Sequence, residues 1–148
     1  MWRTPTEDDF LSAISATEDT TFRTKLLQGG QADPYGPILA QTTGIFRDAI
    51  RSHSANRLDP DASKLPEAAI FHLVVIMRQR LSTRFNVGEQ TEARRDEYKE
   101  ANKWLAGVAK GDIRVEEPGE APSTQTPVLS PAVNESPRRD GWRHQDGI

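Results

Sequence analysis

The sequence predicts a small all-α protein, a helical bundle around one central buried helix, with a long extended C-terminal arm. Residues 68–77 form a run of ten in which His72 is the only polar residue, and this run lies in a chain that is otherwise mostly polar. No stretch alternates long enough to indicate a sheet. From residue 116 onward neither a helical nor a strand period is present. We therefore expect a helical body over residues 1–115 and an arm over residues 116–148.

The central helix is predicted from Leu65 to Phe85. Pro66 stands where the first turn of a helix tolerates proline, and Glu67 follows where an acid suits the positive end of the helix dipole. Leu81 extends the apolar pattern beyond the buried run. That run is shorter than the roughly 20 apolar residues that cross a bilayer, so we expect a core helix and not a membrane span.

Two short helices are expected near the N-terminus. Thr6 followed by Asp9 has the spacing of a helix N-cap, and Phe10 begins a short apolar stripe behind it. A second short helix is predicted over residues 17–27, with Gly29 and its neighbouring glycine ending it.

A longer amphipathic helix is expected to run through Ser52. Asp33 before Pro34 is the favoured order of N-cap and first helical residue, and apolar side chains then recur at helical spacing. Gly44 lies within this helix. It indicates either that another helix packs closely there or that the helix simply tolerates a glycine at this position. Residues 53–64 are predicted to be a connecting loop.

The last helix is predicted over residues 89–110, after a stop at Asn86. One face of this helix is apolar around Trp104, which we expect in the core, and the other face is charged. Lys110 in the last turn and Gly111 just beyond it form a favourable helix end. A short extended segment is expected over residues 113–115.

Composition limits the classes of function. The formal charge is −3 and the pI is about 5.6, so electrostatic capture of nucleic acid is not indicated. Residues 116–148 hold six acids against three arginines, which accounts for the whole −3. The absence of cysteine excludes disulfides and thiolate metal sites. The polar, acidic start lacks the apolar segment of a signal peptide, so we expect a soluble protein made in a cytoplasm.

No pattern indicates an enzyme or a cofactor. The sequence has three histidines and no metal, nucleotide or nucleophile motif. His72 is expected to be a packed or partly exposed structural residue, and His53 a solvated cation at a helix end. His144 lies among arginines of the arm and is a candidate for contact with a partner.

A cluster of arginines marks the end of the central helix and the start of the last one. We call it the basic end and expect these side chains to pair with acids of neighbouring subunits or helices. Contact with phosphate is the alternative. The basic end consists of Arg78, Arg80, Arg84, Arg94 and Arg95.

The arm is rich in proline and has no core of its own, so we expect it to lie extended against another chain. Fully extended, its 33 residues reach on the order of 100 Å. Its apolar and basic side chains are the expected docking residues. They are Val128, Leu129, Val133, Arg138, Arg139, Trp142, Arg143 and Ile148.

The closing segment of the body carries a specific pattern. It consists of Tyr98, Ala101, Trp104, Leu105, Ala109, Gly111, Ile113 and Val115. With the Leu65-Pro66 helix start after a polar loop, it resembles the head–tail adaptor (connector) proteins of tailed bacteriophages, especially the Mu-like family. The resemblance covers residues 6–115. The arm has no counterpart in it, and the Asp-rich loop that many relatives carry after the first helix is absent here.

The resemblance implies a structural protein of the phage neck, part of the virion and made in the cytoplasm of a bacterial host. Its copies would form a ring, of twelve by the same resemblance, seated on the portal protein. A downstream stopper or tail-completion protein would bind the other side. DNA would pass through the lumen without sequence-specific binding. The alternative, from the basic end, is a small helical DNA-binding packaging or regulatory protein.

Overall fold

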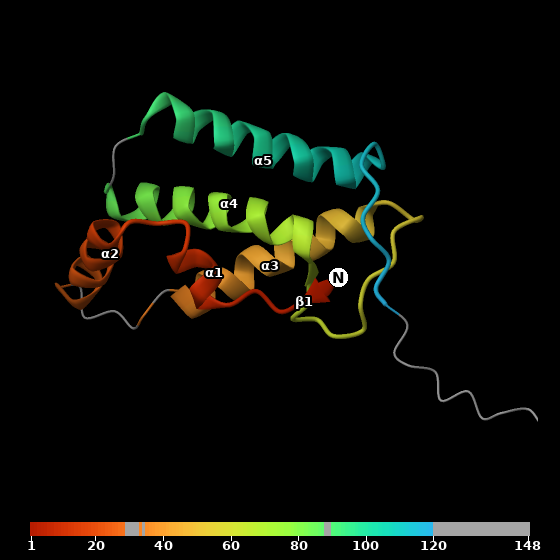
Figure 1. Cartoon of the computed structure of the whole chain (residues 1–148), viewed down its shortest axis with the longest axis horizontal. Helices are drawn as coiled ribbons and strands as arrows, with labels where there is room; N and C mark the ends of the chain where they lie inside the picture. The colour runs from red at the N-terminus through yellow and green to blue at the C-terminus, as the bar shows by residue number, and fades with distance from the viewer. Residues whose placement is uncertain (29–32, 34, 88–89, 120–148) are drawn as a thin grey trace, which may run out of the picture.

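The computed structural model describes residues 1–28, 33, 35–87 and 90–119. The arm from residue 120, Gly29 and Pro34 lie outside these residues, as do the docking contacts expected of the arm. The described chain is mostly helical, which confirms the helical character that the sequence predicts (Figure 1). In order the elements are β1 (Trp2–Arg3), α1 (Glu7–Leu11), α2 (Ala16–Gln28), α3 (Tyr35–Ser52), β2 (Leu65–Pro66), α4 (Glu67–Phe85) and α5 (Glu92–Lys110).

Helices α3, α4 and α5 pack on one another and enclose the core, with α4 and α5 running side by side (Figure 1). As predicted, α4 is the central element, because it contacts every other helix and contributes the largest share of the buried apolar residues. Phe46, Leu73 and Met77 are fully buried between these helices. None of the described helices is long and apolar enough to span a membrane.

The expected helix start at Leu65 is wrong by two residues. Leu65 and Pro66 form the short strand β2, which pairs antiparallel with Trp2 and Arg3 of β1, so the described chain holds a two-stranded sheet that the sequence did not predict. A residue before proline is disfavoured in the helical region, and Pro66 is extended (φ −63°, ψ 143°). Helix α4 therefore begins at Glu67, whose N–H donates to the Met1 carbonyl at 2.9 Å.

The predicted N-cap of α1 is confirmed. The Thr6 hydroxyl accepts from the Asp9 N–H, and the Asp9 carboxylate accepts from the Thr6 N–H at 2.8 Å, which makes a capping box. A second box, between Ser15 and Glu18, begins α2 one residue earlier than expected. Asp33 accepts from the Tyr35 N–H at 3.0 Å, as its predicted capping role requires.

Arg47 is a buried cation inside the body and holds the loop over residues 53–64. Its guanidinium donates to the carbonyl oxygens of Asp59, Asp61 and Lys64 at 2.8–2.9 Å. A loop carbonyl that faces the protein needs a donor in place of water. Arg47 supplies that donor three times, so this predicted loop is fixed against α3.

The C-terminal end of α5 closes against the rest of the body. Gly111 is left-handed (φ 87°), as a C-cap glycine should be, and an added Cβ there would lie 2.2 Å from Nε2 of His53. Residues 112–119 form no strand, and Ile113 of the expected extended segment packs on the core. Trp2 Nε1 donates to the Glu116 carbonyl at 2.8 Å, which ties residue 116 to the N-terminus.

Candidate interaction surfaces

Two surfaces of the body are candidates for binding: the basic end and an apolar groove along α3. Arg78 belongs to the basic end but is used inside the chain. It pairs with Glu97 of α5 and donates to the Ala13 carbonyl, and only 12% of its side chain is exposed. This arginine therefore joins α4 to α5 and to the segment after α1.

Arg94 is also paired within the chain. It contacts the buried carboxylate of Glu18, so α5 is joined to the start of α2. Burial acts to raise the pKa of Glu18, but Arg94 and the Ser15 backbone outweigh it and leave this pKa lowered. Glu18 is thus held as a carboxylate by two partners. The prediction that the basic end pairs with acids of other helices is confirmed for Arg78 and Arg94.

The other three arginines define what the basic end offers to a partner. Arg95 is exposed, Arg80 is half-buried, and neither makes an ion pair with a described residue. Arg84 is exposed and lies over the ring of Phe85, 5.4 Å from its centroid. The surface therefore presents two arginines, Arg80 and Arg95, that make no ion pair with a described residue. Pairing with other subunits stays a prediction.

An aromatic stack joins the three long helices. Trp104 of α5 lies between Phe46 of α3, at 6.0 Å, and His72 of α4, at 4.8 Å. Burial lowers the pKa of His72, and the charge of Glu100 opposes that shift. His72 is half-buried and structural, as predicted. Phe71 beside it is 66% exposed, which makes it the large apolar side chain that the long helices leave most open to solvent.

The solvated position expected of His53 is only partly seen, because this residue at the end of α3 is half-buried, and its charge stays a prediction. Its ring lies over Gly111 at the end of α5, and its Nδ1 is buried without a hydrogen-bond partner among the described residues. A solvated cation was predicted because a helix C-terminus favours one. The ring instead fills the space beside the glycine, which the sequence of α3 alone does not indicate.

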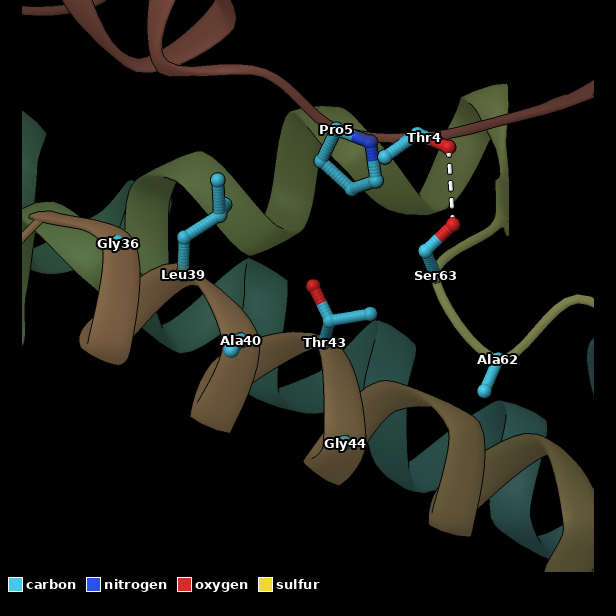
Figure 2. Close-up of a pocket in the computed structure, with 9 residues that line it drawn as sticks. All are labelled: Thr4, Pro5, Gly36, Leu39, Ala40, Thr43, Gly44, Ala62 and Ser63. Carbon is cyan, nitrogen blue, oxygen red and sulfur yellow. Dashed lines mark hydrogen bonds between the residues drawn. The ribbon is translucent and has the colours of Figure 1, made fainter.

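The groove along α3 is a depression with a volume of about 390 Å³. Figure 2 shows α3 as its floor, the N-terminal segment as one wall and the end of the loop over residues 53–64 as the other. Thr4 and Ser63 are joined across it by a hydrogen bond of 3.1 Å. None of the residues that line it is charged. They are Thr4, Pro5, Gly36, Leu39, Ala40, Thr43, Gly44, Ala62 and Ser63.

The sequence prediction missed this groove, although one signal was present. Gly36, Ala40 and Gly44 recur every four residues and so lie on one face of α3. A Cβ added at Gly36 or Gly44 would meet no atom within 4 Å. Of the two alternatives predicted for Gly44, close helix contact is therefore wrong for the described chain.

Among the described residues no group of three or more His, Asp and Glu is placed to hold a metal ion. His144 and the expected docking residues of the arm lie outside the described chain. Comparison of the sequence with protein-family models, with curated proteins and with solved structures finds no match.

Proposed function

We propose that this protein is a structural head–tail adaptor of a phage neck, whose bodies form a ring on the portal and whose arms dock on the portal or on a neighbouring subunit. The role is structural and not catalytic. The observation that carries the proposal is the residue pattern from Tyr98 to Val115. It is a sequence resemblance, and the geometry of the body supports it in two ways.

The first support is that the patterned residues do the packing. Ala101 is fully buried, Trp104 lies in the aromatic stack, and Gly111 takes the left-handed conformation at the helix end. Ile113, another residue of the pattern, packs on the core and lies over Gly107, where an added Cβ would come within 2.8 Å of its Cδ1. These residues decide how α5 packs on the other helices and where it ends. Proteins that share a fold are expected to share such residues.

The second support is the surface available to neighbouring copies. Phe71 protrudes from α4 as an exposed aromatic side chain, and large aromatic residues are common anchors of protein interfaces. Arg80 and Arg95 lie on other turns of the same helix pair, where acids of a neighbouring copy would meet them. Head-to-tail contacts of this kind between unlike surfaces generate rings.

The alternative of a DNA-binding protein rests on the same arginines and is weakened by their pairing. Glu97 and Glu18 neutralise Arg78 and Arg94, so two of the five cations are not available to phosphate. Sub-micromolar, steeply salt-dependent binding to duplex DNA would favour this alternative over the adaptor.

The mass of the full chain in solution, alone and with the portal protein of the same genome, tests the proposal. We expect a complex that contains about twelve copies of the 16.5 kDa chain per portal ring. A chain that stays monomeric and leaves the portal peak unchanged at micromolar concentration contradicts the adaptor role. Native mass spectrometry resolves the stoichiometry.

Removal of residues 120–148 tests the role of the arm. This cut keeps residue 116, which Trp2 holds, so the body should stay folded while stable docking to the portal is lost. Within the full chain, Trp142→Ala should weaken docking more than His144→Ala, because aromatic anchors dominate interface energies. A truncated protein that assembles as well as the full chain would show that the arm is not the docking element.

A further inference from the structure

The groove along α3 lies next to the point where the described chain ends. Pro118 and Gly119 line a depression together with Pro60 and Asp61 of the loop over residues 53–64. The next two residues of that loop, Ala62 and Ser63, form a wall of the groove. Two residues of chain span at most about 7 Å, so the depression lined by Gly119 and Asp61 adjoins the groove wall at Ser63.

The residues that follow match the groove in chemistry. Residues 121–134 are a run of 14 without a charged side chain, bounded by Glu120 and Glu135. The groove likewise has no charged residue on its floor or walls. Within the uncharged run, the apolar residues gather over positions 127–133, which read Pro-Val-Leu-Ser-Pro-Ala-Val. A charged segment would lose hydration in such a groove and find no oppositely charged side chain there. Residues 121–134 carry no charge, so their docking does not incur this cost.

The dimensions match as well. The floor from Gly36 to Gly44 is about 12 Å long at the helical rise of 1.5 Å per residue. A proline-rich strand in the polyproline conformation advances about 3.1 Å per residue, so four or five residues cover the floor. The eight residues between Gly119 and position 128 are ample to reach it. The open space over Gly36 and Gly44 gives side chains such as Val128 and Leu129 room to enter.

We propose that residues 127–133 dock in the α3 groove of their own chain. The short connection favours this occupant, because it raises the effective concentration of the segment at the groove to the millimolar range. Docking places Val128, Leu129 and Val133 on the body of their own chain, in place of the contact with another chain expected above, and leaves residues 138–148 to bind a partner. The proposal does not depend on the adaptor function, since it concerns the isolated chain.

The absence of cysteine in the chain allows a direct test by disulfide cross-linking. In the full chain, Ala40→Cys in the groove is combined with Leu129→Cys in the docking segment. The matched control combines Ala40→Cys with Ser136→Cys, which is also within reach but lies beyond the segment. Under mild oxidation at low micromolar protein we expect the first pair to cross-link about tenfold faster than the control, and as a monomer on a non-reducing gel.

Two results overturn the proposal. Equal rates for the two pairs show that the groove does not select residues 127–133, and a covalent dimer as the main product shows that the segment comes from another copy. Since the portal is absent from this experiment, its outcome is separate from that of the adaptor proposal.

A blocking variant tests the site itself. Gly44→Leu in the background of the first pair places a side chain in the groove, where a Cβ meets no atom within 4 Å and the helix gains a better helix former. We expect cross-linking to slow about tenfold, while Gly44→Ala, the matched control, slows it little. Circular dichroism verifies that both variants keep the helical content. An unchanged rate in Gly44→Leu contradicts docking in the groove.

Discussion

The three-helix core and the N-terminal segment of this protein are held by different forces. Helices α3, α4 and α5 enclose apolar side chains such as Phe46 and Leu73. The segment from β1 to α2 buries Trp2, Phe10 and Phe22 and is also fixed by charged groups, through Arg3, Arg23 and Glu18. Apolar burial is insensitive to pH, whereas ion pairs depend on the charge of each partner. The two regions should therefore fail under different conditions.

The strongest test of this comparison is removal of an aromatic side chain from the core. Phe46 is fully buried and contacts Trp104 of the aromatic stack. Phe46→Ala should lower the free energy of unfolding by about 3–5 kcal/mol, because burial is lost and a cavity remains. Urea unfolding measures the loss, which should be the same at pH 7 and pH 5. A cost below about 1 kcal/mol would mean that the stack is not part of the core.

Arg47 is an exception to the difference between the two regions, because it places a charged side chain inside the apolar three-helix core. Arg47→Ala leaves three loop carbonyls without their donor and should cost about 3 kcal/mol. Arg47→Lys keeps the charge but cannot reach all three carbonyls, so its cost should be intermediate. Urea unfolding ranks the two variants. An Arg47→Lys variant as stable as the parent would assign the effect to charge and not to the three hydrogen bonds.

The ion pair between Arg94 and Glu18 tests the link between the two regions. Arg94→Ala leaves the buried Glu18 carboxylate without its cation and should cost about 1–2 kcal/mol. The exposed pair between Lys99 and Asp96 on the same helix is the matched control, and Asp96→Ala should cost less than about 0.5 kcal/mol. Similar unfolding midpoints for the two variants would show that burial adds nothing to the Arg94 pair.

Acid should affect the N-terminal segment through Asp9. The hydrogen bonds from Arg3 lower the pKa of Asp9 from 3.8 to about 2. Because the folded-state pKa is the lower one, the stabilisation is complete above pH 4 and is lost as the pH falls towards 2. Asp9→Asn should cost about 1–2 kcal/mol at pH 7, and the difference from the parent should shrink by pH 2.5. A constant difference in urea midpoints would contradict the lowered pKa.

The smallest expected effect is the pH response of the core, through His72. Burial lowers the pKa of His72 below 6.5, so the unfolded chain takes up the proton first and stability falls as the pH drops through that value. The effect should be smaller than that of Asp9. His72→Phe keeps the stack on Trp104 and should remove the change in unfolding midpoint between pH 8 and pH 5.5. A midpoint change that persists in His72→Phe belongs to another group.

The sequence by itself determined the helices, the cap of α1 at Thr6, the end of α5 at Gly111 and the central place of α4, whereas the starts of α2, α4 and α5 differ from the predicted ones by one to three residues. These features are local, because capping residues such as Thr6, the glycine at 111 and the ten-residue apolar run act through near neighbours. The tertiary structure decided the pairing of β2 with β1, the three contacts of Arg47 and the groove on α3. Each joins segments that are distant in sequence, so no local pattern specifies it. The sequence around Arg47 does not show whether this arginine faces solvent or binds the carbonyl oxygens of a loop. Only the residues that surround it in the folded chain distinguish the two.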